Sequence, residues 1–231
     1  MDAPASSAMA DRVRELAHDD EVRCVVVTGE GDAFCAGLDM AGDMGGANPA
    51  EELETGFDAI ARGLIRIGEA DGREGARPGG RRRRLHRGRL RLRLPRGRRL
   101  LRVGLHNIGL APDTGATDVL PRLVGTRTAL GLLITGDRID AAEAVELGVA
   151  NEVVPGEELD GFVADRAETL AGRPTKAVAA ARRLVYRSDH RSLEETLREE
   201  ALAQEAMIQI EDFIEGVAAF MADREPAFEG R

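Results

Sequence analysis

The stretch DEVRCVVVTGEGDAFCAGLDM, residues 20–40, holds the pattern that decides the fold. Residues 22–28 are rich in β-branched side chains, follow charged residues and precede Gly29, so they predict a buried strand. Glycine and small residues then follow up to Gly37, which predicts a loop. A strand that leads into a glycine-rich loop, with helical patterns before and after it, indicates an α/β fold.

Helical patterns surround this stretch and fill the second half of the chain. Asp140 with Glu143, and Ser192 with Glu195, form two capping boxes, each of which predicts the beginning of a helix. We expect a core over residues 1–155 and a C-terminal helical region over residues 156–231. The predicted helices cover residues 6–17, 51–67, 140–148, 174–185, 192–210 and 215–222, and a second short strand is predicted over 149–154.

Length and composition set further bounds. With 231 residues, the chain can bury a full core. Its two cysteines, Cys24 and Cys35, have no paired spacing, so a disulfide framework is not expected and a reduced cytoplasm is the expected setting. The sequence has no run of about 18 apolar residues and no recognisable secretory signal, so neither a membrane span nor export is expected.

One segment departs from the rest of the chain in charge. Residues 73–102 hold 14 arginines and one acidic residue, although the whole chain has a net charge of −9. Over residues 72–103 neither a helical nor a strand period is recognisable. Such a segment is either a basic arm that binds a polyanion such as nucleic acid, or a stretch that the gene was not meant to encode.

Four stretches, in order, carry a resemblance to a known family. They are DEVRCVVVTGEGDAFCAGLDM (20–40), IGLAPDTGATDVLPRLVG (108–125), ALGLLITGDRIDAAEAVELGVANEVVP (129–155) and EDFIEGVAAFMADREPAFEGR (211–231). Together they resemble the enoyl-CoA hydratase/isomerase family, the crotonase superfamily, over residues 6–70 and 106–231. The resemblance implies an enzyme that acts on acyl-CoA thioesters. It also implies an α/β crotonase-like spiral of ββα turns with a C-terminal helical region, whose central part is disrupted at residues 72–105.

The resemblance assigns the candidate binding residues. Family members stabilise an enolate at the thioester oxygen with two backbone N–H groups, and the motif match gives the first of these to Leu38. Ala36, Gly37 and Asp39 are implied to lie beside the bound coenzyme A. The alternative is that this segment is an ordinary loop between a strand and a helix.

Asp113 is the implied proton-transfer group. Family hydratases place a glutamate eight residues before this position, where this chain has Leu105. Isomerase-type members instead carry an acid at the position of Asp113, and a carboxylate in an apolar pocket can act as a proton shuttle. Asp113 therefore favours isomerisation of an enoyl-CoA double bond, or related ring chemistry, over hydration. The alternative is that Asp113 caps a helix that begins near Thr114.

The resemblance also implies the cofactors and partners. It implies catalysis without a metal or redox cofactor, because coenzyme A is part of the substrate. The acidic charge of the rest of the chain and the lack of aromatic residues in the arginine-rich segment argue against a nucleic-acid partner. Family members are commonly trimers or dimers of trimers that assemble through the C-terminal helices. Phe213, Phe220 and Phe228 are candidate contacts in such an assembly, and ordinary packing within one chain is the alternative.

A pair of compensating frameshifts explains the arginines. Between residues 71 and 106 the family has a buried strand, a glycine-rich turn with the second oxyanion N–H, and an apolar helix. In a GC-rich gene, a codon that ends in C and precedes a G spells arginine when it is read out of frame. We expect the shifts near residues 71–76 and 103–106, and a chain that is impaired as translated. The rival interpretations are the polyanion-binding arm and a non-catalytic relative with a long solvated loop.

Overall fold

The computed structural model describes residues 1–29, 34, 35, 37, 48–67, 100–102 and 109–231. The chain divides into two compact units, each built from segments that are far apart in the sequence. The first unit combines Met1–Ala10, Val27–Ala61 and Arg91–Val163, and the second combines Asp11–Val26, Arg62–Leu90 and Ala164–Arg231. The predicted boundary between a core and a helical region at residue 155 stays a prediction.

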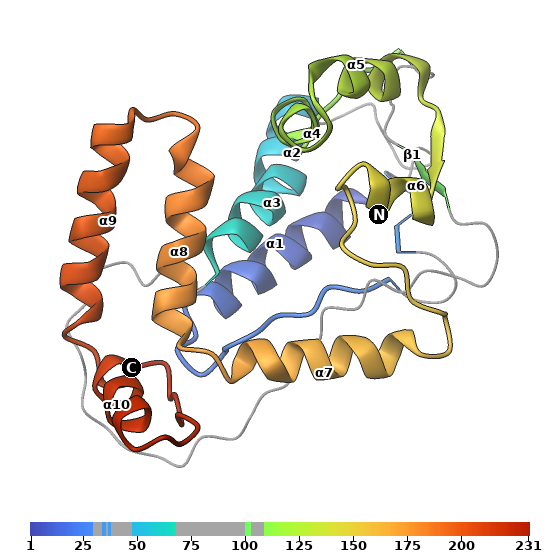
Figure 1. Cartoon of the computed structure of the whole chain (residues 1–231). Helices are drawn as coiled ribbons and strands as arrows, with labels where there is room; N and C mark the ends of the chain where they lie inside the picture. Colours follow the sequence, from blue (N-terminus) through green and yellow to red (C-terminus); the bar gives the residue numbers. More distant parts are fainter. Residues whose placement is uncertain (30–33, 36, 38–47, 68–99, 103–108) are drawn as a thin grey trace. The chain divides into compact units, whose positions relative to one another are not determined.

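Helices near the N-terminus follow the sequence pattern with one exception. α1, Ala3–Ala17, confirms the helix predicted over residues 6–17 (Figure 1). The helix predicted over residues 51–67 is instead two helices, α2, Pro49–Thr55, and α3, Phe57–Arg66. Gly56 separates them, because its φ of −100° and ψ of −97° are not helical. A Cβ atom at Gly56 would lie 2.6 Å from Oγ of Ser6, so only glycine lets the start of α1 come this close.

The described strands are not the ones that the sequence predicts. Residues 22–28 and 149–154 form no strand, although Val22 and Val26 are buried as expected. A strand needs a hydrogen-bonded partner, and β-branched composition alone does not provide one. β1, Leu100–Arg102, pairs antiparallel with β2, Arg138–Asp140. β1 lies within residues 72–103, where the sequence shows no recognisable strand period.

A helical pair and a short helix complete the described part of the first unit. α4, Ala116–Val124, packs on α5, Thr126–Thr135, and their buried core is Leu120, Ala129 and Leu133 (Figure 1). α6, Ala141–Glu146, begins where predicted, because Asp140 accepts a hydrogen bond from the backbone N–H of Glu143 at 2.9 Å. β2 ends at this same Asp140.

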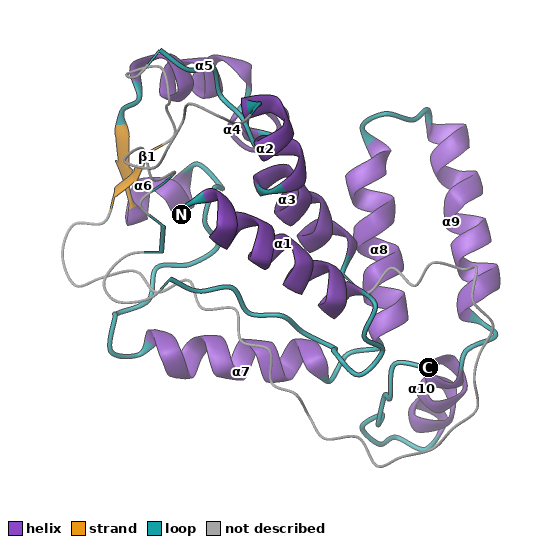
Figure 2. Ribbon diagram, turned by 180° about the vertical axis from the view of Figure 1, so that it is seen from behind, coloured by secondary structure: helices purple, strands orange, loops and turns teal. Residues whose placement is uncertain are grey.

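The C-terminal region is helical, as predicted. Ser192 begins α9 through the predicted capping box with Glu195. α8 and α9 lie side by side as an antiparallel pair (Figures 1 and 2). No helix in the described parts of the chain is both long and apolar enough to cross a membrane. The helices of this region are α7, Leu159–Ala171, which the sequence pattern does not predict, then α8, Thr175–Ser188, α9, Leu193–Met207, and α10, Glu211–Met221.

Candidate active site

The loop with the predicted oxyanion donor is described at Phe34, Cys35 and Gly37. Gly37 has a φ of 95°, a conformation that favours glycine, and a Cβ atom there would meet no heavy atom within 4 Å. Backbone conformation rather than space is therefore the reason for glycine at this position. The other predicted binding and oxyanion residues of the loop, Ala36, Leu38 and Asp39, lie outside the described residues.

Two hydrogen bonds hold Gly37 in this conformation. Its N–H donates to Sγ of Cys35 at 3.3 Å, and the amino group of Met1 donates to its carbonyl oxygen at 2.7 Å.

Asp113 ends the loop that precedes α4 and is half-buried. Its backbone carbonyl accepts a hydrogen bond from the Ala116 N–H at 2.9 Å, and its Oδ1 accepts one from Oγ1 of Thr114 at 3.2 Å. The N-cap of α4 is Gly115, which has no side chain to bind the helix. The interpretation of Asp113 as a helix cap is therefore wrong, because the chain turns into α4 through backbone geometry.

That turn is strained. Thr114 has a φ of 51° and Gly115 a φ of 79°, so two consecutive residues adopt left-handed conformations directly after Asp113. A left-handed residue other than glycine costs on the order of 1 kcal/mol and persists only where the surroundings impose it. Backbone strain of this kind often accompanies a functional site, and Asp113 is the residue directly before it.

The two candidate loops belong to the same compact unit. Between their described residues no hydrogen bond or ion pair connects Gly37 with Asp113. Burial raises the pKa of the thiol of Cys24, which precedes the first loop in the sequence, so less of this thiol is present as the nucleophilic thiolate. The chemistry available from the described residues is thus a half-buried carboxylate and a backbone loop shaped by glycine.

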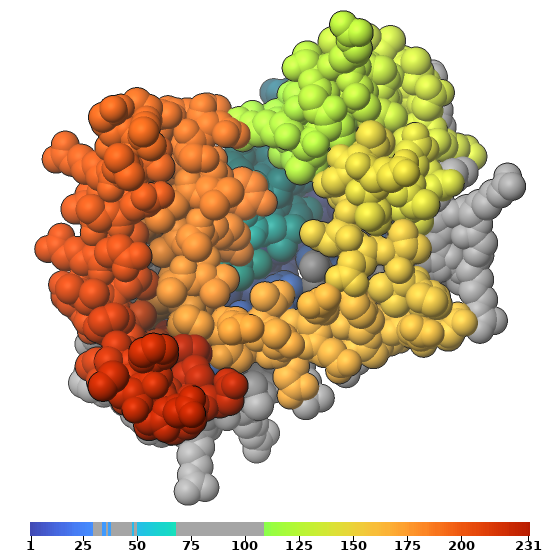
Figure 3. Space-filling view, in the orientation of Figure 1, coloured from blue at the N-terminus to red at the C-terminus, as the bar shows by residue number. Residues whose placement is uncertain are grey.

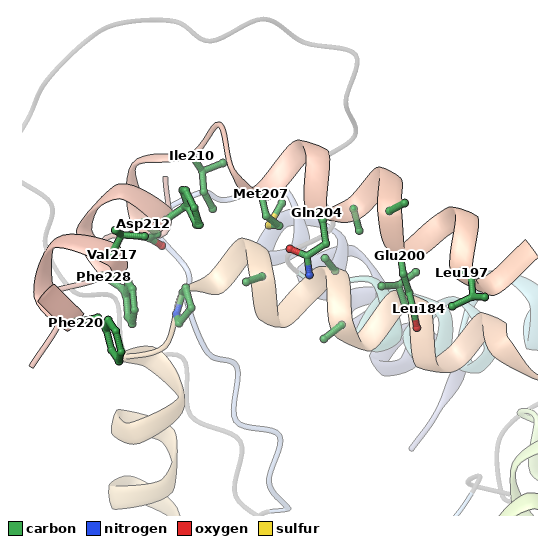
Figure 4. A pocket seen from close by; sticks show the side chains of 18 residues that line it. Leu184, Leu197, Glu200, Gln204, Met207, Ile210, Asp212, Val217, Phe220 and Phe228 are labelled. Atoms are coloured by element: carbon green, nitrogen blue, oxygen red, sulfur yellow. The ribbon is translucent and has the colours of Figure 1, made fainter. Parts of the chain in front are cut away.

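A second feature, which sequence reasoning missed, is an apolar groove in the C-terminal helices. It has a volume of about 820 Å³ and is lined by side chains of α8, α9 and α10 together with Pro174 and Phe228 (Figure 4). The three predicted assembly residues, Phe213, Phe220 and Phe228, all line it. Helical periodicity marks the apolar faces of the single helices, but it does not reveal that they meet.

Comparison with known proteins places these features in a family. The sequence model of the enoyl-CoA hydratase/isomerase family matches residues 103–231, more than half of the chain. The chain belongs to the enoyl-CoA hydratase/isomerase family. This membership confirms the predicted family and the predicted class of enzyme.

Individual members of the enoyl-CoA hydratase/isomerase family match most of the chain. The 1,2-epoxyphenylacetyl-CoA isomerase of Escherichia coli K12 is 29% identical over 96% of this chain and 87% of its own length. A Rhodobacter capsulatus protein named "Probable enoyl-CoA hydratase" is 31% identical over 91% of this chain and 82% of its own. The crystal structure of enoyl-CoA hydratase from Bacillus anthracis covers 97% of this chain and 88% of that one, with a TM-score of 0.77 at 24% identity. This structural likeness confirms the predicted fold.

Proposed function

We propose that the chain isomerises an acyl-CoA thioester, with the Leu38 N–H as oxyanion donor and Asp113 as the proton-transfer group. The Asp113 carboxylate takes a proton from one carbon of the acyl group and leaves an enolate at the thioester oxygen. The proton then returns to a different carbon, so the double bond moves and no atom is lost. No electron leaves the substrate, so the proposal includes neither a redox cofactor nor a metal.

The observation that carries this proposal is the state of Asp113. Asp113 is half-buried, and its side chain does not cap α4, whose N-cap is Gly115. The loop that it ends resembles the isomerase-type motif. The name of the E. coli relative, an isomerase of a CoA thioester, supports the same reaction class. Ala36, Gly37 and Asp39 are proposed to lie beside the bound coenzyme A, as the motif implies.

Hydration of an enoyl-CoA is the second candidate. The name of the R. capsulatus relative favours it. Hydration in this family uses two glutamates, and at one of their positions this chain has Leu105. Because leucine cannot transfer a proton, isomerisation remains the first proposal.

We further propose that residues 72–105 are the product of two compensating frameshifts. The family model begins to match at residue 103, next to the end of the arginine-rich segment. The relatives nevertheless align over more than nine-tenths of the chain. Two compensating frameshifts change the composition of a segment but keep its length close to that of family members. An inserted basic arm would instead make the chain longer than its relatives. Catalysis by the chain as translated is therefore proposed to be impaired.

The assembly of the chain is proposed to use its C-terminal helices. Phe213, Phe220 and Phe228 line one groove, and Phe220 is 84% exposed. Exposed apolar groups gathered in one place are typical of an interface. The proposed assembly is a homotrimer or a dimer of trimers.

Activity assays test the catalytic part of the proposal. Chromatography of the CoA esters follows the movement of the double bond in a short enoyl-CoA. The assay compares the chain as translated with a frame-restored variant, in which codons 72–105 are read in the alternative frame. In the frame-restored variant, Asp113→Asn should lower turnover by about 10²–10⁴-fold, the usual contribution of a positioned acid or base. Binding of coenzyme A esters should stay unchanged.

The matched control is Asp118→Asn, which removes a carboxylate from α4 that pairs with Arg122 at 2.6 Å. This variant should keep its turnover within a factor of about two, because a surface ion pair contributes little. Survival of isomerase activity in Asp113→Asn would refute the role of Asp113. Addition of water to the substrate, without isomerisation, would make hydration the better assignment.

A further inference from the structure

The turn at Asp113 includes one residue that its backbone conformation disfavours. Gly109 and Gly115 lie on either side of Asp113 with φ angles of 78° and 79°, where glycine is the preferred residue. Thr114, between Asp113 and Gly115, has a φ of 51°. A β-branched side chain with a positive φ is an outlier, because its Cβ lies too close to the following carbonyl oxygen. The described part of this loop thus has glycine at two positive-φ positions but threonine at the third.

Thr114 is also unusual among all the residues that the structure describes. Apart from the glycines, only one other described residue, Asp223, has a positive φ, at 50°. Aspartate is several-fold enriched in that conformation, whereas β-branched residues rarely adopt it. Threonine at this position therefore carries conformational strain that a glycine would avoid. What threonine supplies and glycine lacks is a side-chain hydroxyl.

The hydroxyl of Thr114 binds the carboxylate of Asp113. Its Oγ1 donates a hydrogen bond to Oδ1 of Asp113 at 3.2 Å. The backbone carbonyl of Asp113 accepts a second hydrogen bond, from the Ala116 N–H at 2.9 Å. A hydrogen bond to a charged carboxylate is stronger than one between two neutral groups. The two bonds together hold Asp113 at its main chain and at one of its carboxylate oxygens.

The second carboxylate oxygen of Asp113 is available to a substrate. Within the described part of the chain, no group donates a hydrogen bond to this Oδ2. Asp113 is half-buried, and the neighbouring Thr114 and Gly115 are exposed. The two helices that follow the turn, α4 and α5, lie at the surface, where Figure 3 draws them in green. Solvent, and with it a substrate, therefore has access to this turn.

We propose that Thr114 is a positioning residue for Asp113: its hydroxyl holds Oδ1, so that Oδ2 is the oxygen that transfers the proton. The inference rests on the proposed function and adds the residue that orients its proton-transfer group. Oδ2 takes a proton from one carbon of the acyl group, and the electron pair of that C–H bond moves into the enolate. The proton then forms a new C–H bond at another carbon, while the Thr114 hydroxyl keeps its own proton. A carboxylate held in one orientation needs no rearrangement between the two transfers.

Steady-state kinetics of Thr114 variants separate the hydroxyl from the backbone strain, with the frame-restored chain as the parent. Thr114→Val keeps the β-branched shape without the hydroxyl and should lower kcat about tenfold, with KM changed less than about twofold. Thr114→Ser keeps the hydroxyl and should retain kcat within about twofold of the parent. Thr114→Gly should be as slow as Thr114→Val. It should nevertheless unfold at a urea concentration no lower than the parent, because glycine relieves the strain.

A double substitution tests whether Thr114 acts through Asp113. In the Asp113→Asn background, Thr114→Val should cause no further loss of turnover, because no carboxylate is left to orient. The matched control is Thr135→Val, since Oγ1 of Thr135 donates to Oδ2 of Asp137 at 2.6 Å in the same compact unit. This control removes an equivalent bond between a hydroxyl and a carboxylate that has no part in the proposed chemistry. It should keep kcat within about twofold of the parent.

The possible outcomes separate this inference from the proposed function. Parent-like turnover of Thr114→Val or Thr114→Gly, or an equal loss in Thr114→Val and Thr114→Ser, would overturn the positioning role. A tenfold loss from Thr114→Val in the Asp113→Asn background would overturn it too, because Thr114 would then act independently of Asp113. The proposed function survives these results if Asp113→Asn alone lowers turnover as expected. An active Asp113→Asn variant, or a frame-restored chain without turnover, would refute the proposed function and this inference with it.

Discussion

Glu215 makes the C-terminal segment, residues 222–231, sensitive to acid. Its carboxylate accepts hydrogen bonds from Nη1 and Nη2 of Arg224 at 2.6 and 2.8 Å and from the Ala227 N–H at 2.7 Å. These bonds lower the pKa of Glu215 from its ordinary value of 4.5 to about 2. Because the pKa is depressed in the folded state, the stabilisation is complete above pH 4.5 and is lost as the pH falls from 4.5 through 2.

The expected result is a release of residues 224–227 over that range of pH. Hydrogen exchange of the Ala227 amide, read by mass spectrometry, should accelerate relative to its intrinsic rate as the pH drops below 4.5. Glu215→Gln should exchange fast at every pH, while Glu225→Gln, which leaves the Arg224 pair in place, should behave like the parent. A pH-independent protection of Ala227 in the parent would show that the pair does not hold this segment.

The candidate residues differ in how far the sequence alone could identify them. Gly37 and Asp113 were assigned through the resemblance to the family, whose motifs are short local stretches of sequence, and their roles stay predictions. The contacts of Arg23 could not be predicted, since the partners of its guanidinium are Arg173, Thr175 and Phe228, between 150 and 205 residues away. In the sequence Arg23 is simply a polar residue within a buried stretch. Only the folded chain shows that it binds the C-terminal segment.

Elements could be predicted where their signal is local. The capping boxes at Asp140 and Ser192 predicted the beginnings of α6 and α9, because the bonds that begin a helix lie within four residues. The strand predicted over residues 22–28 did not form, because a strand depends on a partner elsewhere in the chain. The break at Gly56 was missed as well, and the close approach of Ser6 to this glycine is a contact between residues far apart in the sequence.

A close contact between α1 and α3 allows a prediction at the scale of elements. Gly63 lies inside α3, and a Cβ atom there would be 2.5 Å from Cγ1 of Val13. Gly63→Ala would gain about 1 kcal/mol of helix propensity, whereas overpacking against a stiff β-branched side chain costs about 1–3 kcal/mol. We expect the overpacking to win, with a loss of about 1 kcal/mol in the free energy of unfolding, measured with urea in the frame-restored chain.

Gly131→Ala is the matched control for this change. Gly131 lies inside α5, and a Cβ atom there would meet nothing within 4 Å. The same substitution should therefore stabilise the protein by about 1 kcal/mol. If both variants shift the free energy of unfolding in the same direction, the contact between α1 and α3 is looser than the structure indicates.

At the scale of the whole molecule, the arginine-rich segment conflicts with the fold of the family, which has apolar residues in this region. Both units combine parts of the chain from before and after the arginine-rich segment. Each unit can therefore fold only if that segment is compatible with a folded core. The family has a buried strand and an apolar helix there, and a buried guanidinium without an anionic partner is costly. A domain is stable by only about 5–15 kcal/mol, so several such costs would remove most of its stability.

Restoring the reading frame over residues 72–105 should therefore raise the free energy of unfolding by several kcal/mol and turn a broad urea transition into a cooperative one. Turnover of an enoyl-CoA should rise by at least about 10²-fold if the restored segment supplies the second oxyanion N–H that the family resemblance implies. The control replaces Arg81, Arg82, Arg83 and Arg84 by glutamine, which removes charge without restoring apolar residues, and should recover little of either property. Equal gains from glutamine would mean that charge alone disturbs the chain. An equally stable and equally active parent would mean that the arginines belong to the functional protein.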